Sequence, residues 1–353
     1  MPSPVDRLNH VDALKGAAIL LVVAGHFLEL FPADPVASTV YTAVYSFHMP
    51  LFVMLCGLFA RDSLTAKQSE AVIERVVIPL LIFWPPYYYL GRWATGEDAY
   101  SWTMPYWHLW FLASLACWRM LLPLFRSPAG LAISVALALA AGLSSDISMA
   151  LSLSRTVYFL PFFVFGSLYG RQILSWVADH RKLGIAFVVL MAVTVLWHLN
   201  GLEGTSLRGS FDYAAVSVFT DHPMLGRALV MLLGLCGALT FPALVPEKNR
   251  ALEYLGRRSL GIYLLHGALV LAGRRMPMPQ DGGWWLVPAV LAVSVATAFA
   301  LAPLTPMVAA LSGMVADRVS RFNSWVGHAL RLSRIRARRA RPDAQGRVTR
   351  PQA

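Results

Sequence analysis

One apolar segment near the start of the sequence, DALKGAAILLVVAGHFLELF, carries residues that could do acid–base chemistry. Its imidazole, His26, can take a proton from a hydroxyl near pH 7 when neutral. Lys15 lies almost three α-helical turns before His26, so both side chains would project from one face, about 16 Å apart along the axis. Asp12 falls one turn before Lys15 on the same stripe. Ionisable groups inside a membrane helix are costly and mark functional sites. We therefore interpret His26 as a candidate general base and Lys15 as a candidate site for an anionic substrate.

Three other histidines would lie at the same depth as His26. They are His48 in YSFHMPLF, His108 in YWHLWFL and His266 in GIYLLHG. Counted from the ends of their apolar runs, all four imidazoles would lie roughly 5–13 Å below the outer membrane boundary. This convergence predicts a shared polar cavity that opens outward, where the three would line the acceptor side or stabilise an oxyanion. For each one alone, a hydrogen bond to a neighbouring helix is an equal alternative.

The spacing of histidines and cysteines and the absence of nucleotide-binding and hydrolase motifs argue against other kinds of site. Membrane di-iron sites need histidines three or four residues apart, and no two of the 9 histidines are that close. The 3 cysteines, Cys56, Cys117 and Cys236, lie in apolar runs without a metal or disulfide spacing. No phosphate-binding loop, dinucleotide fingerprint or G-x-S-x-G elbow occurs. We expect neither a metal nor a bound cofactor.

The elements that position these residues are membrane helices. The chain has 353 residues, of which 57% are hydrophobic and only 14% charged, and its mean hydropathy is +0.56. Runs long enough to cross a bilayer recur throughout, which predicts an all-α, polytopic transmembrane bundle of about ten spans. The first span is expected to be a retained helix and not a cleaved signal peptide. The predicted spans are 13–31, 39–60, 75–93, 104–125, 129–145, 156–173, 183–200, 223–245, 257–273 and 284–312.

The distribution of charge orients the bundle. With both termini in the cytoplasm, most of the 30 Lys and Arg residues fall in cytoplasmic segments, as the positive-inside rule requires. We predict a membrane domain over 1–317 and a basic, disordered cytoplasmic tail over 318–353 that rests on anionic lipid headgroups. No nucleic-acid partner is expected. The external segments would hold only Arg92, Arg155, Arg208, Arg227, Arg274 and Arg275.

Several segments together resemble a known family. KGAAILLVVAGH, from Lys15 to His26, is similar to the basic residue, ten residues and histidine that open the acyltransferase-3 family of integral membrane O-acyltransferases, especially its fucose acetylase-like branch. FHMPLFVMLCGLFAR resembles the second-helix motif of that family, with Cys56 where serine is usual. ERVVIPLLIFW resembles its third-helix entrance, where Arg75 matches the second position of R-x-x-R and Val72 replaces the first. HLWFLASLACWRML, YFLPFFVFGSLYGR and LGRRSLGIYLLH follow in the family's order, so the likeness runs from about residue 7 to 273.

The resemblance implies a particular reaction. Members of the family transfer an acyl group, usually acetyl, from cytoplasmic acyl-CoA to a sugar hydroxyl on a cell-envelope or exported glycan. On this basis His26 would be catalytic, either as general base or as a transient acyl carrier. Lys15 and Arg75 would bind the donor, with Asp12 positioning Lys15. The expected partners are acyl-CoA as co-substrate, a glycan acceptor and the bilayer of the inner (plasma) membrane.

A transporter of a sugar or lipid-linked intermediate, coupled to protons through His26, is the alternative. Such carriers usually need carboxylates in the middle of the membrane, and here only Glu29 lies away from a predicted boundary or loop. The distribution of acids therefore favours the enzyme.

Overall fold

The computed structural model describes residues 4–60, 65–96, 103–105, 107–147, 150–210, 212–213, 221–279 and 282–321, with side chains from residue 10 onward. Within these ranges the chain forms helices and no strands. Seven helices are long and apolar enough to cross a membrane, and three shorter apolar helices accompany them. The fold is therefore the predicted all-α, polytopic helical bundle of a multi-pass membrane protein.

Every predicted span corresponds to a helix. The first half of the chain forms α1 (Pro4–Leu28), α2 (Pro35–Leu58), α3 (Ala66–Val72), the π-helical segment η1 (Ile73–Val77), α4 (Ile78–Thr95), η2 (Trp107–Leu109), α5 (Trp110–Phe125) and α6 (Pro128–Ala140). The second half forms α7 (Leu153–Asp179), α8 (Leu183–Leu199), α9 (Pro223–Thr240), α10 (Arg250–Arg257), α11 (Ser259–Gly273) and α12 (Leu286–Leu301). Short 3-10 turns follow α6, α9 and α12 and precede α7. The number of helices that cross the bilayer and the orientation of the termini stay predictions.

Several helices extend beyond the predicted apolar runs. The third begins at Ala66, not near residue 75, because Thr65 and Gln68 form a capping box ahead of a polar first turn. The last helical stretch passes Pro303 and Pro306 through the 3-10 turn η8 (Ala302–Leu304) and continues to Arg321. Hydropathy reports only the part of a helix that lies in hydrocarbon, so it misses such polar extensions. The predicted tail beyond Arg321 lies outside the described residues.

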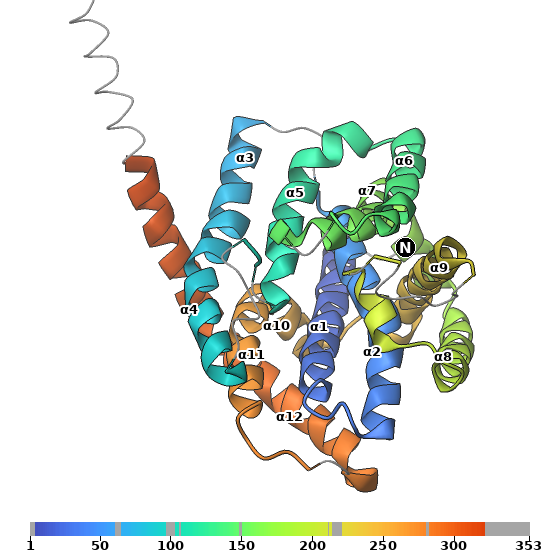
Figure 1. The fold of residues 1–353 in the computed structure, drawn as a ribbon. Helices are drawn as coiled ribbons and strands as arrows, with labels where there is room; N and C mark the ends of the chain where they lie inside the picture. Colours follow the sequence, from blue (N-terminus) through green and yellow to red (C-terminus); the bar gives the residue numbers. More distant parts are fainter. Residues whose placement is uncertain are drawn as a thin grey trace, which may run out of the picture.

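Helix α1 lies in the middle of the bundle and contacts α2, α10, α11 and α12 (Figure 1). Its contact with α10 depends on two glycines. A side chain at Gly16 would overlap the Leu252 carbonyl, and one at Gly256 would overlap the Asp12 carbonyl. Small residues allow membrane helices to approach backbone to backbone. This packing fixes the N-terminal half of α1, which carries Lys15, against the α10–α11 junction.

At the other end of α1, a short connection leads into α2. The Asp34 carboxylate caps α2 by accepting a hydrogen bond from the Ala37 N–H at 2.8 Å, and it also accepts one from the Gly282 N–H at 3.1 Å. These backbone hydrogen bonds hold the pKa of Asp34 below its usual range. The cap therefore ties the α1–α2 connection to the start of α12, on the same side of the protein as His26.

Candidate active site

His26 lies in the last turn of α1 and is paired with an acid that directly follows the end of this helix. Its Nδ1 is 3.4 Å from Oε1 of Glu29 and 3.3 Å from the Tyr45 hydroxyl. About 12% of its side chain is exposed. A proton on Nδ1 is favoured by these two acceptors, which leaves the lone pair of a neutral imidazole on Nε2. His26 is thus oriented as a base would need to be.

Glu29 is a second residue of the candidate site. The sequence predicted it to be an acid inside the membrane but gave it no role. Its carboxylate accepts hydrogen bonds from the Tyr45 hydroxyl at 2.6 Å and the Trp107 indole N–H at 3.1 Å. Arg274 lies 3.5 Å away and completes the set. A buried carboxylate requires such partners to remain charged. The sequence feature that could have indicated this pairing is the position of Glu29 three residues after His26, about one helical turn away.

The structure brings three of the four predicted histidines together. The ring centroids of His26 and His266 are 5.3 Å apart and stacked, His108 and His266 are 5.2 Å apart, and His26 and His108 are 6.3 Å apart. His48 is separated from His26 by the Tyr45 ring, and the ring centroids of Tyr45 and His48 are 4.6 Å apart. These four residues, which we call the histidine cluster, come from α1, α2, η2 and α11.

Only His26 of this cluster keeps an appreciable exposed surface. His48, His108 and His266 are 2%, 1% and 0% exposed, so they lie behind neighbouring rings instead of on an open wall. Both ring nitrogens of His108 and Nε2 of His266 are buried without a hydrogen-bond partner among the described residues. Buried polar atoms normally have partners. The orphaned nitrogens therefore indicate a place where a polar ligand group or water binds.

The tautomers of two buried histidines follow from their partners. Nδ1 of His266 lies 2.8 Å from the Tyr263 carbonyl, and Nδ1 of His48 lies 2.8 Å from the Val44 carbonyl. A carbonyl oxygen can only accept, so each neutral ring carries its proton on Nδ1. Nε2 of both rings is consequently a hydrogen-bond acceptor.

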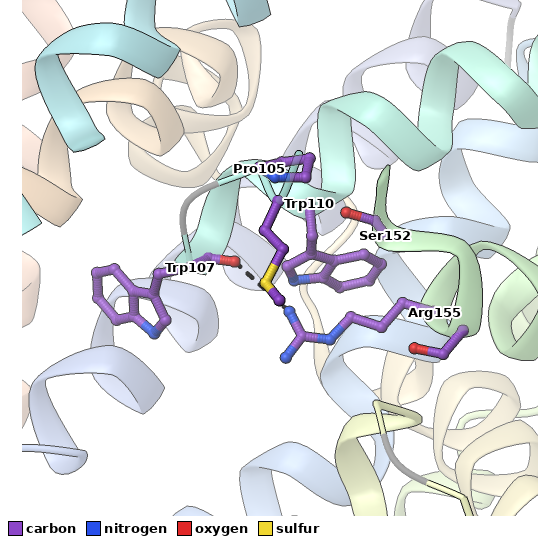
Figure 2. Close-up of a pocket in the computed structure, with 7 residues that line it drawn as sticks. Pro105, Trp107, Trp110, Ser152 and Arg155 are labelled. Carbon is purple, nitrogen blue, oxygen red and sulfur yellow. Dashed lines mark hydrogen bonds between the residues drawn. The ribbon is translucent and has the colours of Figure 1, made fainter. Parts of the chain in front are cut away.

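Trp107 is a second site residue that the sequence did not single out. Its ring centroid is 4.3 Å from that of His26, and its backbone has φ +37°, a conformation that non-glycine residues rarely adopt. Arg155 holds this backbone by donating to the Trp107 carbonyl at 3.5 Å while its guanidinium lies 5.1 Å from the Trp110 ring (Figure 2). Strained backbone of this kind concentrates at functional sites. These residues border a small cavity of about 30 Å³, and Figure 2 shows the side chains that line it.

The predicted donor residues meet in a different place, a cavity of about 490 Å³ at the N-terminal half of α1, which we call the basic cavity. Lys15, Asp12 and Arg75 all line it, and Nζ of Lys15 lies 3.3 Å from the Asp12 carboxylate. Two further cations, Arg119 and Arg257, were not predicted. Arg75 reaches the cavity from the π-helical segment η1, a local geometry that is frequent at functional sites.

Helices α1, α2 and α11, which carry cluster histidines, also line the basic cavity, as does α5, which directly follows η2 and His108. On α2, His48, Phe52 and Cys56 are spaced by four residues, and on α5 the cavity residues Phe111, Leu115 and Arg119 continue the face that begins near His108. On α11, Tyr263 precedes His266 by one turn. Residues at these spacings share a helix face. The cavity is therefore lined by the same faces that end in the histidine cluster.

Tyr263 touches both regions. It lines the basic cavity, its ring centroid is 5.3 Å from that of His108 and 6.1 Å from that of His266, and its hydroxyl donates to the His108 carbonyl. Among the described residues, no group of three or more His, Cys, Asp or Glu could hold a metal ion. The residues that could do chemistry are an imidazole–carboxylate pair at one end of α1 and a cationic cavity at the other.

These features define a multi-pass membrane protein with a buried imidazole–carboxylate site. Residues 8–303 match the family model Acyl_transf_3, described as an acyltransferase domain. The match covers most of the chain, so the protein belongs to this family of membrane acyltransferases and the resemblance inferred from the sequence is confirmed. The chain is also similar to nodulation protein NolL of Sinorhizobium fredii (strain NBRC 101917 / NGR234), at 40% identity over 81 residues, or 21% of this chain and 22% of NolL. No solved structure matches.

Proposed function

We propose that the protein transfers an acyl group, most simply acetyl, from cytoplasmic acyl-CoA to a sugar hydroxyl of a cell-envelope or exported glycan. The observation that carries this proposal is the run of helix faces that joins the basic cavity to the histidine cluster. A phosphate-bearing donor suits the cationic end of the run, and a hydroxyl acceptor suits the exposed edge of His26. The plasma membrane is the proposed location, because there one face meets CoA and the other meets the envelope.

In this mechanism Glu29 fixes the His26 ring. With the proton on Nδ1 directed to Glu29 and Tyr45, Nε2 takes the proton of the acceptor hydroxyl. The hydroxyl oxygen attacks the thioester carbonyl, the carbon–sulfur bond breaks, and the CoA thiolate is protonated to the thiol. Alternatively, Nε2 attacks the thioester itself and the carbon–sulfur bond breaks, which releases the CoA thiolate. The acceptor hydroxyl then attacks the acyl-imidazole, the bond to Nε2 breaks, and the hydroxyl proton ends on the thiolate.

The other three histidines fall into two groups according to which ring nitrogen is free to donate or accept a hydrogen bond. Nε2 of His48 and of His266 can accept a hydrogen bond while the ring is neutral, so these residues suit acceptor hydroxyls and not an oxyanion. His108 has no carbonyl that consumes its N–H, so it is the histidine that could donate to a developing oxyanion. His108 is therefore our candidate for oxyanion stabilisation.

Proton-coupled transport is less well supported. A carrier needs an acid that binds and releases protons readily, whereas Glu29 is held by Tyr45, Trp107, Arg274 and His26. So many donors stabilise a permanently charged carboxylate that orients its neighbour.

The test is replacement of His26 by Ala and, separately, by Gln. Purified protein in vesicles would be given labelled acetyl-CoA and envelope glycans, and transfer would be followed by mass spectrometry of the glycans. We expect transfer to fall by roughly 10²–10⁴-fold, because removal of a general base has this effect. His180→Ala, at an exposed position after α7, serves as the control and should transfer normally. Substantial activity in both His26 variants would refute the assignment.

The same preparation distinguishes the two routes. An acyl-imidazole would be seen as a mass increase of the intact protein when acetyl-CoA is supplied without acceptor, and it should be absent from His26→Gln. Direct transfer leaves the protein mass unchanged.

A further inference from the structure

The cations of the basic cavity differ in whether an acidic side chain lies close to them. Lys15 lies 3.3 Å from Asp12, and Arg257 lies 3.8 Å from the same carboxylate and 3.6 Å from Glu253. These two cations therefore share nearby acids. Arg119 also lines the cavity, and its Nε is buried without a hydrogen-bond partner among the described residues.

An unpartnered guanidinium nitrogen is unusual, because a buried polar atom that has left water needs a replacement partner. Arg119 projects from α5, on the same face as Leu115 and Phe111. Two helical turns, about 12 Å along the axis, separate Arg119 from Phe111. The α5 face is therefore cationic at one end and apolar at the end nearest the histidine cluster.

The rest of the lining supplies further cations and apolar side chains, and Nζ of Lys15 lies 4.2 Å from the centroid of the Phe59 ring. Asp12, Lys15, Arg75 and Arg257 line the cavity, together with the apolar residues Phe52, Leu55, Phe59, Val76 and Leu260. Four cations against one carboxylate give the lining an excess of positive charge. An occupant that complements it has several negative charges at one end and a neutral, slender portion at the other.

We infer that Arg119 binds a phosphate of the CoA portion of the donor, together with Arg75 on the facing η1 segment. This inference rests on the proposed function and assigns a residue to its donor site. The planar guanidinium forms paired hydrogen bonds with phosphate oxygens, which is the partner that Nε of Arg119 lacks. The neutral pantetheine arm then extends past Phe111 to Tyr263, whose ring contacts His108.

Direct binding tests the inference without requiring turnover. Labelled CoA is titrated onto the full-length protein in nanodiscs of neutral lipid, for wild type, Arg119→Gln, Arg119→Lys and the control Arg171→Gln. Loss of a charge-assisted hydrogen bond predicts a Kd about tenfold or more higher for Arg119→Gln. Arg119→Lys should be intermediate, because it keeps the charge without the planar fork. Arg171 is exposed on α7 and does not line the cavity, so its variant should bind like wild type.

Two further binding measurements distinguish recognition of the CoA phosphates from other reasons for weaker CoA binding. Pantetheine, which lacks the phosphates, should compete equally weakly for wild type and Arg119→Gln. A variant that weakens both ligands alike has a distorted cavity, and the inference is then wrong. Nanodiscs with phosphatidylglycerol test whether a lipid headgroup is the natural occupant. We expect the Kd for CoA to be unchanged there, and displacement of CoA that depends on Arg119 would assign the residue to lipid instead.

Kinetics keep this inference distinct from the proposed function. If wild type transfers acetyl but Arg119→Gln has the wild-type KM for acetyl-CoA, only the Arg119 assignment fails. If CoA binds through Arg119 but no glycan is ever acylated, the proposed function fails while the phosphate contact stands. If Arg119→Gln does not fold, the Arg119→Lys variant decides through its own Kd.

Discussion

At the scale of single residues, the feature that sets His26 apart from the other buried histidines is its carboxylate. His48 and His266 direct Nδ1 to backbone carbonyls of their own helices, as a histidine in a helix bundle commonly does. His26 instead directs Nδ1 to Glu29, which is itself anchored by an arginine. A carboxylate stabilises an imidazolium where a neutral carbonyl does so only weakly.

Replacing Glu29 by Gln tests this difference. The amide is close in size but carries no charge, and it can present an N–H to His26, which favours the wrong tautomer. We expect kcat to fall at least about a hundredfold, with little change in KM for acetyl-CoA, because the donor cavity is elsewhere. The control Glu203→Gln changes an exposed acid in the loop after α8 and should leave kcat unchanged. Equal effects of the two substitutions would show that Glu29 has no special role.

How much of the site was predictable differs from residue to residue. Helical counting predicts four histidines at one depth and Lys15 with Asp12 three turns below, because it needs only the rise per residue. The structure brings three of those four rings together. The partners of Glu29 were not predictable, since Tyr45, Trp107 and Arg274 come from three other segments. Arg119 was hidden for a related reason. Its sequence neighbours are apolar, and only the folded bundle shows that it lines the same cavity as Arg75.

At the scale of elements, the close contact of α1 with α10 determines how the cations of the basic cavity are arranged. Gly16 and Gly256 bring the two backbones together, so Asp12, which pairs with Lys15 on its own helix, also comes within reach of Arg257. Helix α10, from Arg250 to Arg257, was not predicted, because eight residues with several charges give no span-length apolar run. The positions of the longer helices followed from hydropathy, whereas their polar extensions depended on capping.

Substituting Gly256 by Ala tests the importance of that contact. The added methyl group would overlap the Asp12 carbonyl, and overpacking of this kind lowers the free energy of unfolding by about 1–3 kcal/mol. Gly313→Ala is the matched control, because a side chain there meets nothing within 4 Å, and alanine favours a helix by up to about 1 kcal/mol. Thermal unfolding in detergent should therefore show a lower midpoint for Gly256→Ala only. Equal midpoints would mean that α1 and α10 separate without cost.

At the scale of the whole molecule, the basic cavity and the exposed edge of His26 are at opposite ends of α1. Lys15 and His26 are about 16 Å apart along the helix axis. Under the proposed function, CoA and the acceptor approach from different faces of the membrane and meet through the pantetheine arm.

Sealed inside-out vesicles test the arrangement. Labelled acetyl-CoA outside such vesicles, on their cytoplasmic face, should label acceptor trapped in the lumen and leave acceptor on the cytoplasmic face unlabelled. Lys15→Ala should raise the KM for acetyl-CoA more than the KM for the acceptor, because it weakens donor binding. Label found only on cytoplasmic-face acceptor would disprove transfer across the membrane even if the enzyme is active.

The packed rings of Tyr263, His108 and His266 between the two ends bear on the electrical balance of each turnover. An acyl group leaving CoA inward of the rings and arriving on a hydroxyl outward of them is equivalent to one positive charge moving out, unless the hydroxyl proton moves in. Against an inside-negative potential, that charge costs about 2.3 kcal/mol per 100 mV. Turnover is electroneutral, and its rate independent of membrane voltage, only if the hydroxyl proton moves inward as the acyl group moves outward.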